Sequence, residues 1–492
     1  MESISKYYNR RVEGMGQAEP GTGTRQKVLL YNPSAVFFDM PLALLAVGSA
    51  LDSETYEVLI IDSRLDPDAH QQVLAQLPDA LCIGMTVLTG SPLRDALDLA
   101  EKIKRRRPDF PVIWGGWHPS LFPEETLRDE SSIDITVQGQ GELTFRRLVD
   151  ALSRGTSLTE IPGITFRNAG SIQRNPGAPL LDMDQLPAAR YDLIPVDSYL
   201  GRKKRRQLDY ISSIGCRFRC SFCADPFVYQ RGWKAISPSQ MMQQLSHLVR
   251  LHRIEDINFQ DETFFTSQRR VREIAKKMAC LEPRVTWAAT MRADQGARLS
   301  EGDFRELASC GLRRVLIGVE SGSQKMLDWM KKDIRLEQVQ LCAERCRDNG
   351  IGVIFPFIVG FPDEPLASIL QSLQLASQLR RMDPQFTTPI FFFKPYPGSE
   401  ISQFVQDQGY ALPRDTREWA DFDYIGSCGP WVDPSVRRLV DNFRFYNRLE
   451  GGVRGLWFEP LRKLARWRID HRSYGFPVEK LIDKIRPQAD LS

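Results

Sequence analysis

The stretch Ile211–Cys223, read ISSIGCRFRCSFC, holds three of the nine cysteines of the chain. Three residues separate Cys216 from Cys220 and two separate Cys220 from Cys223, directly after a strand-like run at Leu208–Ile214. Thiolates are soft ligands that suit iron–sulfur clusters and zinc. A structural zinc site needs four ligands, and no further Cys or His pair follows at zinc-finger spacing. Three thiolates suit a cluster of four irons with one iron left open; the alternative is three unrelated thiols in a loop.

Length and composition set the broad class. The 492 residues exceed what one core normally supports, so we expect two or three domains. Hydrophobic residues make up 42% and charged residues 26%, as in ordinary soluble proteins. The net charge of +3 argues against global nucleic-acid binding, and we predict no nucleic-acid partner. Nine cysteines without a signal-peptide pattern or a bilayer-length apolar run favour a cytoplasmic protein with ligated or buried thiols.

The N-terminal third alternates strands and helices after a polar lead-in at 1–25 that we expect to be disordered. Strands are predicted at 27–34, 56–64, 80–90, 111–120 and 133–142, with helices at 41–51 and 91–106. Near-continuous apolar strands predict a parallel, doubly wound (Rossmann-like) sheet over 26–156. Ligands of such sheets lie beyond the carboxyl ends of the strands. Those ends are Asn32–Ser34, Thr86–Gly90, Gly115–His118 and Gly139–Glu142.

Residues 157–207 are turn-rich and predict a linker that ends in the basic run GRKKRR at 201–206. Such a run can be a nuclear signal or a nucleic-acid patch. We favour a solvated approach to the next domain, because no aromatic residue interrupts the run.

A second alternating series predicts an α/β barrel over 208–400. Its strands are expected at 208–214, 256–262, 285–294, 314–321, 352–362 and 385–397. Helices are expected at 239–252, 268–280, 301–310, 336–349 and 365–381. Six such units suggest a partial (β/α)6 TIM-type barrel, whose chemistry sits at the C-terminal strand ends. The cysteine loop follows the first strand, and a mostly helical C-terminal region follows at 401–492.

The cysteine loop, with Phe222 directly before its last cysteine, resembles the signature loop of the radical S-adenosylmethionine (SAM) enzymes. That resemblance implies a 4Fe–4S cluster held by Cys216, Cys220 and Cys223, with SAM at the open iron. Further short motifs at the strand ends are similar to SAM-contacting motifs of this family. The residues implied for SAM binding are Phe222, Asp261, Glu262, Arg292, Glu320, Ser321, Gly360 and Tyr396.

In relatives, polar groups at the position of Asp261–Glu262 lie near the methionine amino group, and an arginine like Arg292 meets its carboxylate. The GVESGS element around Glu320 contacts the ribose and methionine. The GFP turn at Gly360 lies beneath the adenine, and Tyr396 belongs to a YPG-like close of the sixth strand. Each piece alone is a common turn or core motif, whereas five in order at strand ends carry the resemblance.

The N-terminal domain resembles the cobalamin-binding domain that precedes the barrel in one radical SAM class, through GGWHPSLFPEE (115–125) and QGQGELTF (138–145). The residues implied for cobalamin are Asn32, Ser34, Thr86, Leu88, Thr89, Gly90, Gly115, Gly116, Trp117, His118, Gly139, Gly141 and Glu142. The chain departs from domains with an Asp-x-His-x-x-Gly loop, because Asp68–Ala69–His70 is followed by Val73 instead of glycine. His118 is a candidate axial ligand. The alternative is a cofactor-free flanking domain.

The resemblance implies an enzyme that forms a 5′-deoxyadenosyl radical and modifies an unactivated carbon of a hydrophobic small molecule or lipid. Methyl transfer through cobalamin is the expected outcome, with a flavodoxin- or ferredoxin-type reductant as partner. The FPEE stretch at Phe122–Glu125 is similar to the anaerobic magnesium-protoporphyrin ester cyclases, so oxidative ring formation on a tetrapyrrole or lipid stays open. A barrel-only radical SAM enzyme and a regulator with a silent barrel are further alternatives.

The C-terminal residues 435–492 carry 13 Lys/Arg against seven Asp/Glu. Apolar residues interleave with these cations: Trp457, Phe458, Leu461, Leu464 and Trp467. This composition is typical of an interfacial basic helix and predicts peripheral membrane contact. A helix packed on the barrel with a solvated cationic face is the alternative. We expect the remaining cysteines, including Cys342 and Cys346 on one helix, to pack in the core or to stand alone.

Overall fold

The chain divides into two units in the computed structural model, which describes residues 25–36, 38–422, 428–452, 459–474, 477 and 479–480. The first unit comprises 1–202, 224–236 and 411–424, and the second 203–223, 237–410 and 425–492. Of the lead-in predicted to be disordered, only Arg25 is described. No helix of the described ranges has both the length and the apolar character needed to cross a membrane.

A seven-stranded sheet in the order β2-β1-β3-β4-β5-β6-β7 forms the centre of the first unit. Its parallel strands are β1 (Gln26–Asn32), β2 (Tyr56–Asp62), β3 (Ala80–Thr86), β4 (Val112–Gly115) and β5 (Ile135–Val137). Its helices are α2 (Leu42–Ser49), α3 (Ala69–Gln76), α4 (Ser91–Arg106), α5 (Trp117–Leu121), α6 (Pro123–Asp129) and α7 (Glu142–Arg154). The strand order reverses between β1 and β3, which is where ligands of doubly wound sheets bind. The predicted Rossmann-like fold is confirmed.

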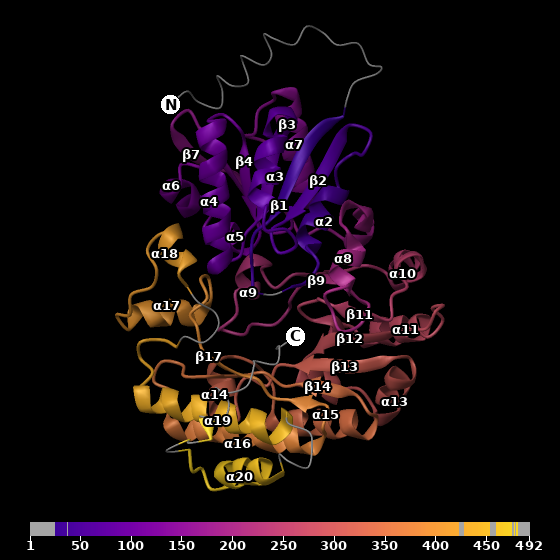
Figure 1. The fold of residues 1–492 in the computed structure, drawn as a ribbon, viewed down its shortest axis with the longest axis vertical. Helices are drawn as coiled ribbons and strands as arrows, with labels where there is room; N and C mark the ends of the chain where they lie inside the picture. The colour runs from indigo at the N-terminus through magenta and orange to yellow at the C-terminus, as the bar shows by residue number, and fades with distance from the viewer. Residues whose placement is uncertain are drawn as a thin grey trace. The chain divides into compact units, whose positions relative to one another are not determined.

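Alternation along β1 explains why helices cover both faces of this sheet (Figure 1). Leu29 and Tyr31 belong to a buried cluster that includes residues of α3 and α4. Leu30, on the opposite face, lies against Gly48 of α2. All three side chains are at most 1% exposed. Because full burial of such a side chain contributes roughly 1.5–3 kcal/mol, the central strands hold the layers together.

Several predicted boundaries in this unit are wrong in detail. The strand predicted at 111–120 ends at Gly115, because Gly116 takes φ +98° and α5 begins at Trp117. The strand predicted at 133–142 covers only Ile135–Val137, and α7 begins at Glu142. The helix α3 was not predicted, since its hydrophobic periodicity is weak. Helix α18 (Thr416–Ala420) also belongs to this unit.

The segment 157–207 is more than the predicted linker. It contains the strands β6 (Ile164–Asn168) and β7 (Ser171–Arg174), which extend the sheet antiparallel to β5. Ala169 and Gly170 join them with φ +48° and +86°, a two-residue hairpin turn. The short strands were missed because Pro- and Gly-rich flanks dominate the composition. Helix α8 (Val196–Leu200) follows before the basic run.

The second unit contains a six-stranded parallel sheet in the order β16-β14-β13-β12-β11-β8. The strands are β8 (Gln207–Tyr210), β11 (Asp256–Phe259), β12 (Thr286–Met291), β13 (Leu312–Ile317), β14 (Gly352–Ile354) and β16 (Phe386–Thr387). Each strand lies beside its predecessor in this list, as a partial (β/α)6 barrel requires. Two predicted strands are interrupted, and their second halves form the parallel pair β15 (Phe357–Val359) and β17 (Ile390–Phe392).

The helices between these strands match the predicted set: α10 (Pro238–His252), α11 (Gln268–Met278), α13 (Glu301–Ser309), α15 (Leu336–Asp348) and α16 (Leu366–Met382). The expected helical C-terminal region includes α17 (Glu400–Asp407), α19 (Pro434–Gly452) and α20 (Glu459–Asp470). Trp457 and Phe458 lie outside the described residues. Cys342 and Cys346 on α15 are fully buried, which confirms core packing.

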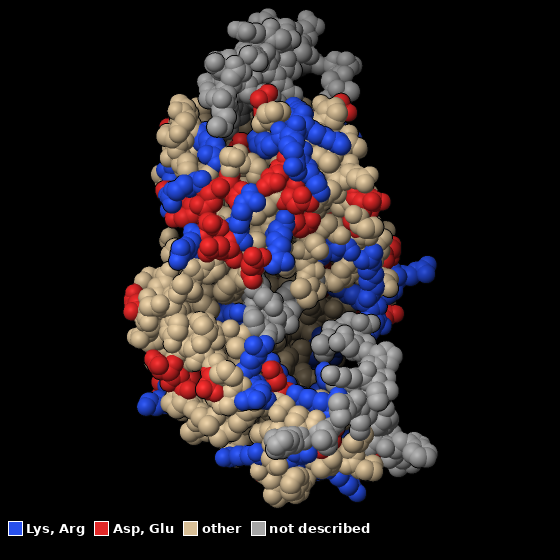
Figure 2. Space-filling model, turned by 60° about the vertical axis from the view of Figure 1, so that its left-hand side comes forward, with Lys and Arg blue, Asp and Glu red and all other residues tan. Residues whose placement is uncertain are grey.

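Charges of both signs are interspersed over the described surface in Figure 2, without a continuous basic field on the face shown. Within the basic run 201–206, Lys203 pairs with Asp209 at 2.5 Å, and Arg206 donates to the His252 carbonyl at 3.0 Å. The run is therefore only partly the predicted solvated approach, because Arg202, Lys204 and Arg205 are exposed but Lys203 is mostly buried.

Candidate cofactor sites

The cysteine loop follows β9 (Ser213–Gly215) and is tied to two other segments of its unit. The Ser221 amide donates to the Met330 carbonyl, and the Ser221 carbonyl accepts from Ile401, both at 2.9 Å. Arg219 forms two bonds with Asp333 at 2.8 and 3.0 Å. These contacts hold the loop between its cysteines against the rest of its unit.

In their chemistry, the three thiols suit the predicted role as iron ligands. Cys216 and Cys220 are buried, Cys223 is half-buried, and none of them is in a disulfide. Among the described residues, no three His, Cys, Asp or Glu side chains converge as tightly as one metal ion requires. A cubane binds its three thiolates through three different irons, so its ligands need not converge on one point.

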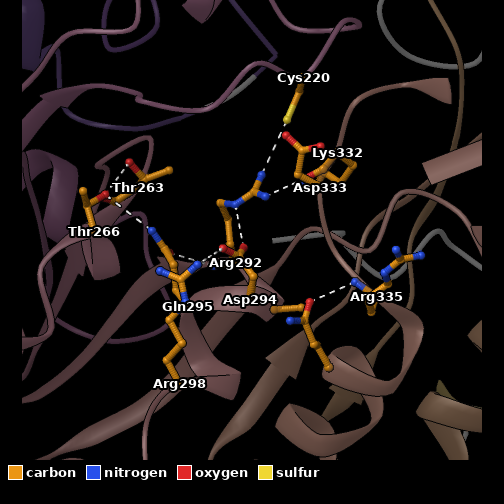
Figure 3. A network of polar contacts seen from close by, with 12 residues as sticks. Cys220, Thr263, Thr266, Arg292, Asp294, Gln295, Arg298, Lys332, Asp333 and Arg335 are labelled. Carbon is orange, nitrogen blue, oxygen red and sulfur yellow. Dashed lines mark hydrogen bonds and ion pairs between the residues drawn. The ribbon is translucent and has the colours of Figure 1, made fainter. Parts of the chain in front are cut away.

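Arg292 lies at the end of β12 beside this loop (Figure 3). Its Nη1 is 3.5 Å from the Sγ of Cys220, and its Nε donates to Asp294 at 2.8 Å. Its Nη2 donates to the Lys332 carbonyl at 2.5 Å, and the guanidinium carbon lies 3.6 Å from the ring centroid of Phe218. The guanidinium is therefore held in one orientation and places a positive charge beside a predicted iron ligand.

Glu320 is buried and pairs with Lys332, a residue that the sequence analysis missed. Lys332 Nζ lies 2.8 Å from Glu320 Oε1, and each side chain is less than 10% exposed. Burial alone would lower the pKa of Lys332, but the charges of Glu320 and Cys220 outweigh it and raise that pKa. Glu320 has φ +67°, an unusual conformation for a residue with a side chain, and such strain clusters at functional sites.

The two acids after β11 differ in availability. Asp261 is 1% exposed and accepts from the Ser212 amide and hydroxyl and from the Ser213 hydroxyl at 2.5–2.7 Å. Burial raises the pKa of Asp261. Glu262 is half-buried and accepts from the Gly215 amide at 3.2 Å. Asp261 thus shapes the strand end, and Glu262 is the better placed of the two to meet a ligand.

Ser321 and Phe222 also have defined surroundings. Ser321 is fully buried, and its hydroxyl lies 3.2 Å from that of Ser372, so it supports the strand end internally. The half-buried Phe222 ring has its centroid 5.8 Å from Lys332 Nζ. Tyr396 is 39% exposed after β17.

Glycine is required at position 360, in the turn after β15. Gly360 has φ +77°, and a side chain there would press on Val432 and Phe392 at 3.0–3.1 Å. Trp431 Nε1 donates to the Gly360 carbonyl at 2.8 Å. Glu364, which the sequence analysis also missed, accepts from the Gly360 and Phe361 amides, and burial raises its pKa.

In the first unit, some of the residues implied for cobalamin have open surroundings at the strand ends. Others form hydrogen bonds or packing contacts within the unit. Leu88 is 41% exposed after β3, and Gly139 after β5 has φ +68° with open space where a Cβ would lie. Gly90 has φ +103°. An exposed apolar side chain and backbone without side chains are suitable for contact with a large planar ring. These residues fit the cofactor.

Other implied residues have structural partners. Asn32 is buried and donates to Asp62 at 3.0 Å, while the Ser34 amide donates to Asp95 at 2.6 Å. A side chain on Gly116 would lie 3.0 Å from the Val87 backbone, so this glycine allows two strand-end loops to pack. Gly141 has Val47 at 3.3 Å from its Cβ position.

The remaining implied residues are Thr86 and Trp117, which are half-buried, Gly115, whose Cβ position has ordinary space, and Glu142. Trp117 packs edge-on against Tyr229 with centroids 5.8 Å apart. Burial raises the pKa of Glu142 at the start of α7.

His118 lies inside the first unit. It has no exposed surface, its Nδ1 is 3.2 Å from the Thr89 hydroxyl, and its Nε2 has no hydrogen-bond partner among the described residues. Burial lowers the pKa of His118 to about 3. His118 is fully buried, and its role as an axial ligand stays a prediction. His70 lies on α3, with Nε2 2.7 Å from Asp95.

Comparison with known proteins finds two family models that match this chain. The Radical SAM superfamily model matches residues 210–376, and the B12 binding domain model matches residues 34–149. An uncharacterized methyltransferase of Pyrococcus horikoshii is 28% identical over 406 residues, 81% of this chain and 86% of that protein. An anaerobic magnesium-protoporphyrin IX monomethyl ester cyclase of Synechocystis is 25% identical over 352 residues, 70% of this chain and 68% of that protein.

Among solved structures, the cobalamin-dependent SAM radical enzyme OxsB with aqua-cobalamin and SAM bound is similar with a TM-score of 0.73. The match covers 92% of this chain and 73% of that chain at 19% identity, so it supports the fold.

Proposed function

Because the chain belongs to the radical SAM enzymes that carry a B12-binding domain, we propose that it transfers a methyl group to an unactivated carbon of a hydrophobic small molecule. Its cofactors are a 4Fe–4S cluster, SAM and cobalamin. The similarity to a methyltransferase over 86% of that protein's length carries the choice of methyl transfer.

The cofactors supply the electron, the radical source and the methyl carrier, and the chain supplies binding, orientation and electrostatics. Cys216, Cys220 and Cys223 would hold the cluster. Arg292 and Glu320 would hold the charged methionine end and the ribose of SAM. A charge-assisted contact of this kind is roughly twice as strong as a neutral one.

The turn after β15 would support the adenine. Gly360 presents backbone without a side chain, and hydrogen bonds with Glu364 and Trp431 hold that backbone in place. In the first unit, Leu88 and Gly139 would contact the corrin, because they offer exposed apolar surface and open backbone.

Mass spectrometry of anaerobic reactions tests the proposal. Reconstituted protein is incubated with cobalamin, a chemical reductant, candidate extracts and SAM that carries a deuterated methyl group. A product that gains the labelled methyl group supports methyl transfer. Labelled SAM consumed without any labelled product in every extract would contradict it.

Ring formation is the second candidate, because the Synechocystis cyclase aligns with 70% of this chain. The FPEE stretch lies at the start of α6, where Glu124 and Glu125 occupy the first helical turn. In the same reactions, a product lighter by two hydrogens and without label would support an oxidative cyclase.

A one-electron reductant of the flavodoxin or ferredoxin class is proposed as the physiological partner. Anaerobic mixing of the reconstituted enzyme with a reduced flavodoxin would test it through SAM cleavage. Cleavage with dithionite but not with flavodoxin or ferredoxin would contradict the proposal.

Contact with an anionic membrane surface is proposed for α20. This helix buries Ala465 and Ile469 and exposes Leu464 and Trp467, at 36% and 50%. Lys463 and Arg466 are exposed beside them, and each cation near an anionic surface contributes about 1 kcal/mol. Flotation with phosphatidylserine vesicles should capture the wild type but not Arg466→Ser/Trp467→Ser, whereas Arg305→Ser on α13 should behave as wild type. Equal flotation of all three proteins would contradict the contact.

A further inference from the structure

We propose that Lys332 is a positioning residue of the cluster site, which holds Glu320 in place and fixes a positive charge beside the Cys220 ligand. The inference rests on the proposed role of Cys220 as an iron ligand. No motif in the sequence marks Lys332, which is one of two adjacent lysines after α14 (Gln324–Trp329).

The burial of Lys332 is the first observation. Its ammonium is 2.8 Å from Glu320 and 5.8 Å from the Phe222 ring centroid, and its side chain is 8% exposed. Isolating an ammonium from water is costly unless a counter-charge compensates for the lost hydration. The chain bears this cost next to the cysteine loop, whose Phe222 ring faces the ammonium.

Space for this ion pair is built into the strand end. A Cβ on Gly318 would collide with Glu320 Oε1 and would lie 2.9 Å from Lys332 Nζ. The pair therefore occupies the volume that a side chain at position 318 would take. Gly318→Ala should displace the pair without changing either charged residue.

The backbone around Lys332 is the third observation. Lys331 and Asp333 have φ +52° and +53°, both in the left-handed region that residues with side chains avoid. Asp333 pairs with Arg219 of the cysteine loop, and Lys331 pairs with Glu400. These outer pairs hold a strained loop whose middle residue, Lys332, is buried against Glu320. The Lys332 carbonyl also accepts a hydrogen bond from Arg292. The backbone of Lys332 therefore links its own ammonium to the guanidinium of Arg292.

A fixed cation at this place has a direct redox consequence. One-electron reduction, with dithionite as the electron donor, adds one negative charge to a 4Fe–4S cluster. A nearby positive charge in a low-dielectric site stabilises the reduced form. Loss of the ammonium leaves the buried Glu320 carboxylate without its counter-charge, so the cluster should become harder to reduce and its midpoint potential should shift to a more negative value.

Potentiometry on the reconstituted full-length chain tests the proposal, with EPR as the readout of the reduced cluster. Lys332→Met and Gly318→Ala should keep their iron and shift the midpoint potential negatively. Lys332→Arg should lie closer to the wild type, and Lys325→Met, an exposed lysine on α14, should match the wild type. Calorimetry should show weaker SAM binding for Lys332→Met, since Glu320 is no longer held.

An unchanged midpoint potential in Lys332→Met would overturn the inference. The proposed function would still stand in that case if the wild type binds iron and cleaves SAM. A wild type that binds no iron would overturn the proposed function itself. If Lys332→Met alone loses iron, Lys332→Met/Glu320→Gln should regain it, because no unpaired charge stays buried. Iron loss in this double variant as well would contradict the role of the ion pair.

Discussion

The carboxylate of Glu364 accepts the backbone N–H of Gly360 at 2.7 Å and that of Phe361 at 3.2 Å. One side chain from two residues before the start of α16 thus shapes the turn that is expected to lie beneath the adenine of SAM. Its other oxygen accepts from Ser368 at 3.0 Å.

Glu364→Ala should weaken SAM binding, because two buried amides lose their acceptor and the turn loses its support. The expected loss in binding free energy is about 1–3 kcal/mol, measured by calorimetry. Asp363→Asn, a change at the exposed neighbour, should bind SAM normally. Equal affinities for Glu364→Ala and the wild type would remove the turn from the SAM site.

The cysteine loop should bind about four irons per chain after anaerobic reconstitution. Replacing Cys216, Cys220 and Cys223 by alanine should abolish both the iron and reductive SAM cleavage. Cys280→Ala, at an exposed cysteine, should retain both. A triple variant that still cleaves SAM reductively would disprove the ligand assignment.

Arg292→Met should reduce SAM affinity by roughly 1.5–3 kcal/mol, the range for a charge-assisted contact in a partly buried site. It also leaves Asp294 without its partner at 2.8 Å, so thermal unfolding must be recorded beside calorimetry. Arg305→Met, on the exposed face of α13, is the matched control. Unchanged SAM affinity in a folded Arg292→Met protein would exclude this arginine from the site.

Cobalamin uptake should separate two glycines. Gly139→Ala should fold with a cost of about 1–2 kcal/mol for its left-handed backbone, yet lose cobalamin, because the new methyl group enters open space at the strand ends. Gly170→Ala has the same positive φ and open surroundings in the β6–β7 turn, and it should retain cobalamin. Equal uptake by both variants, measured by absorbance, would place the ring elsewhere.

Gly116→Val should also lose cobalamin, but through the fold, since its side chain would meet the Val87 backbone. Iron content should survive in this variant, because the cysteine loop belongs to the other unit.

His118 should make the apoprotein less stable in mild acid. Its pKa is about 3 in the fold and 6.5 when unfolded, so below pH 6.5 the unfolded chain binds a proton that the folded chain does not. The contribution of neutral His118 to the free energy of unfolding is fully present above pH 6.5, and it falls as the pH drops toward 3. Between pH 7 and 5 the free energy of unfolding should fall by roughly 2 kcal/mol through this residue. Urea unfolding of His118→Gln should lack this component, and an identical pH dependence would show that His118 titrates normally.

Much of the site was predictable from the sequence because it depends on local order. The spacing of Cys216, Cys220 and Cys223 lies within eight residues, and most strand ends are marked by a glycine, a charge or a small polar residue directly after an apolar run. Parallel sheets bring such ends to one edge whatever the details of packing. The order of elements therefore predicted both sheets, whereas the assignment of cofactors to particular strand ends by the short motifs stays a prediction.

Tertiary structure decided which of these residues keep exposed surface and which are used internally. Asp261 and Asn32 lie at predicted strand ends. Their polar groups, however, form hydrogen bonds with residues distant in the sequence, Ser212 and Asp62 respectively. Lys332 is the opposite case, because no local pattern distinguishes it from its neighbour Lys331. Only the packing of the fold buries Lys332 beside Glu320. Local pattern determines where a strand ends, whereas burial and pairing across the fold determine the charge and orientation of each side chain there.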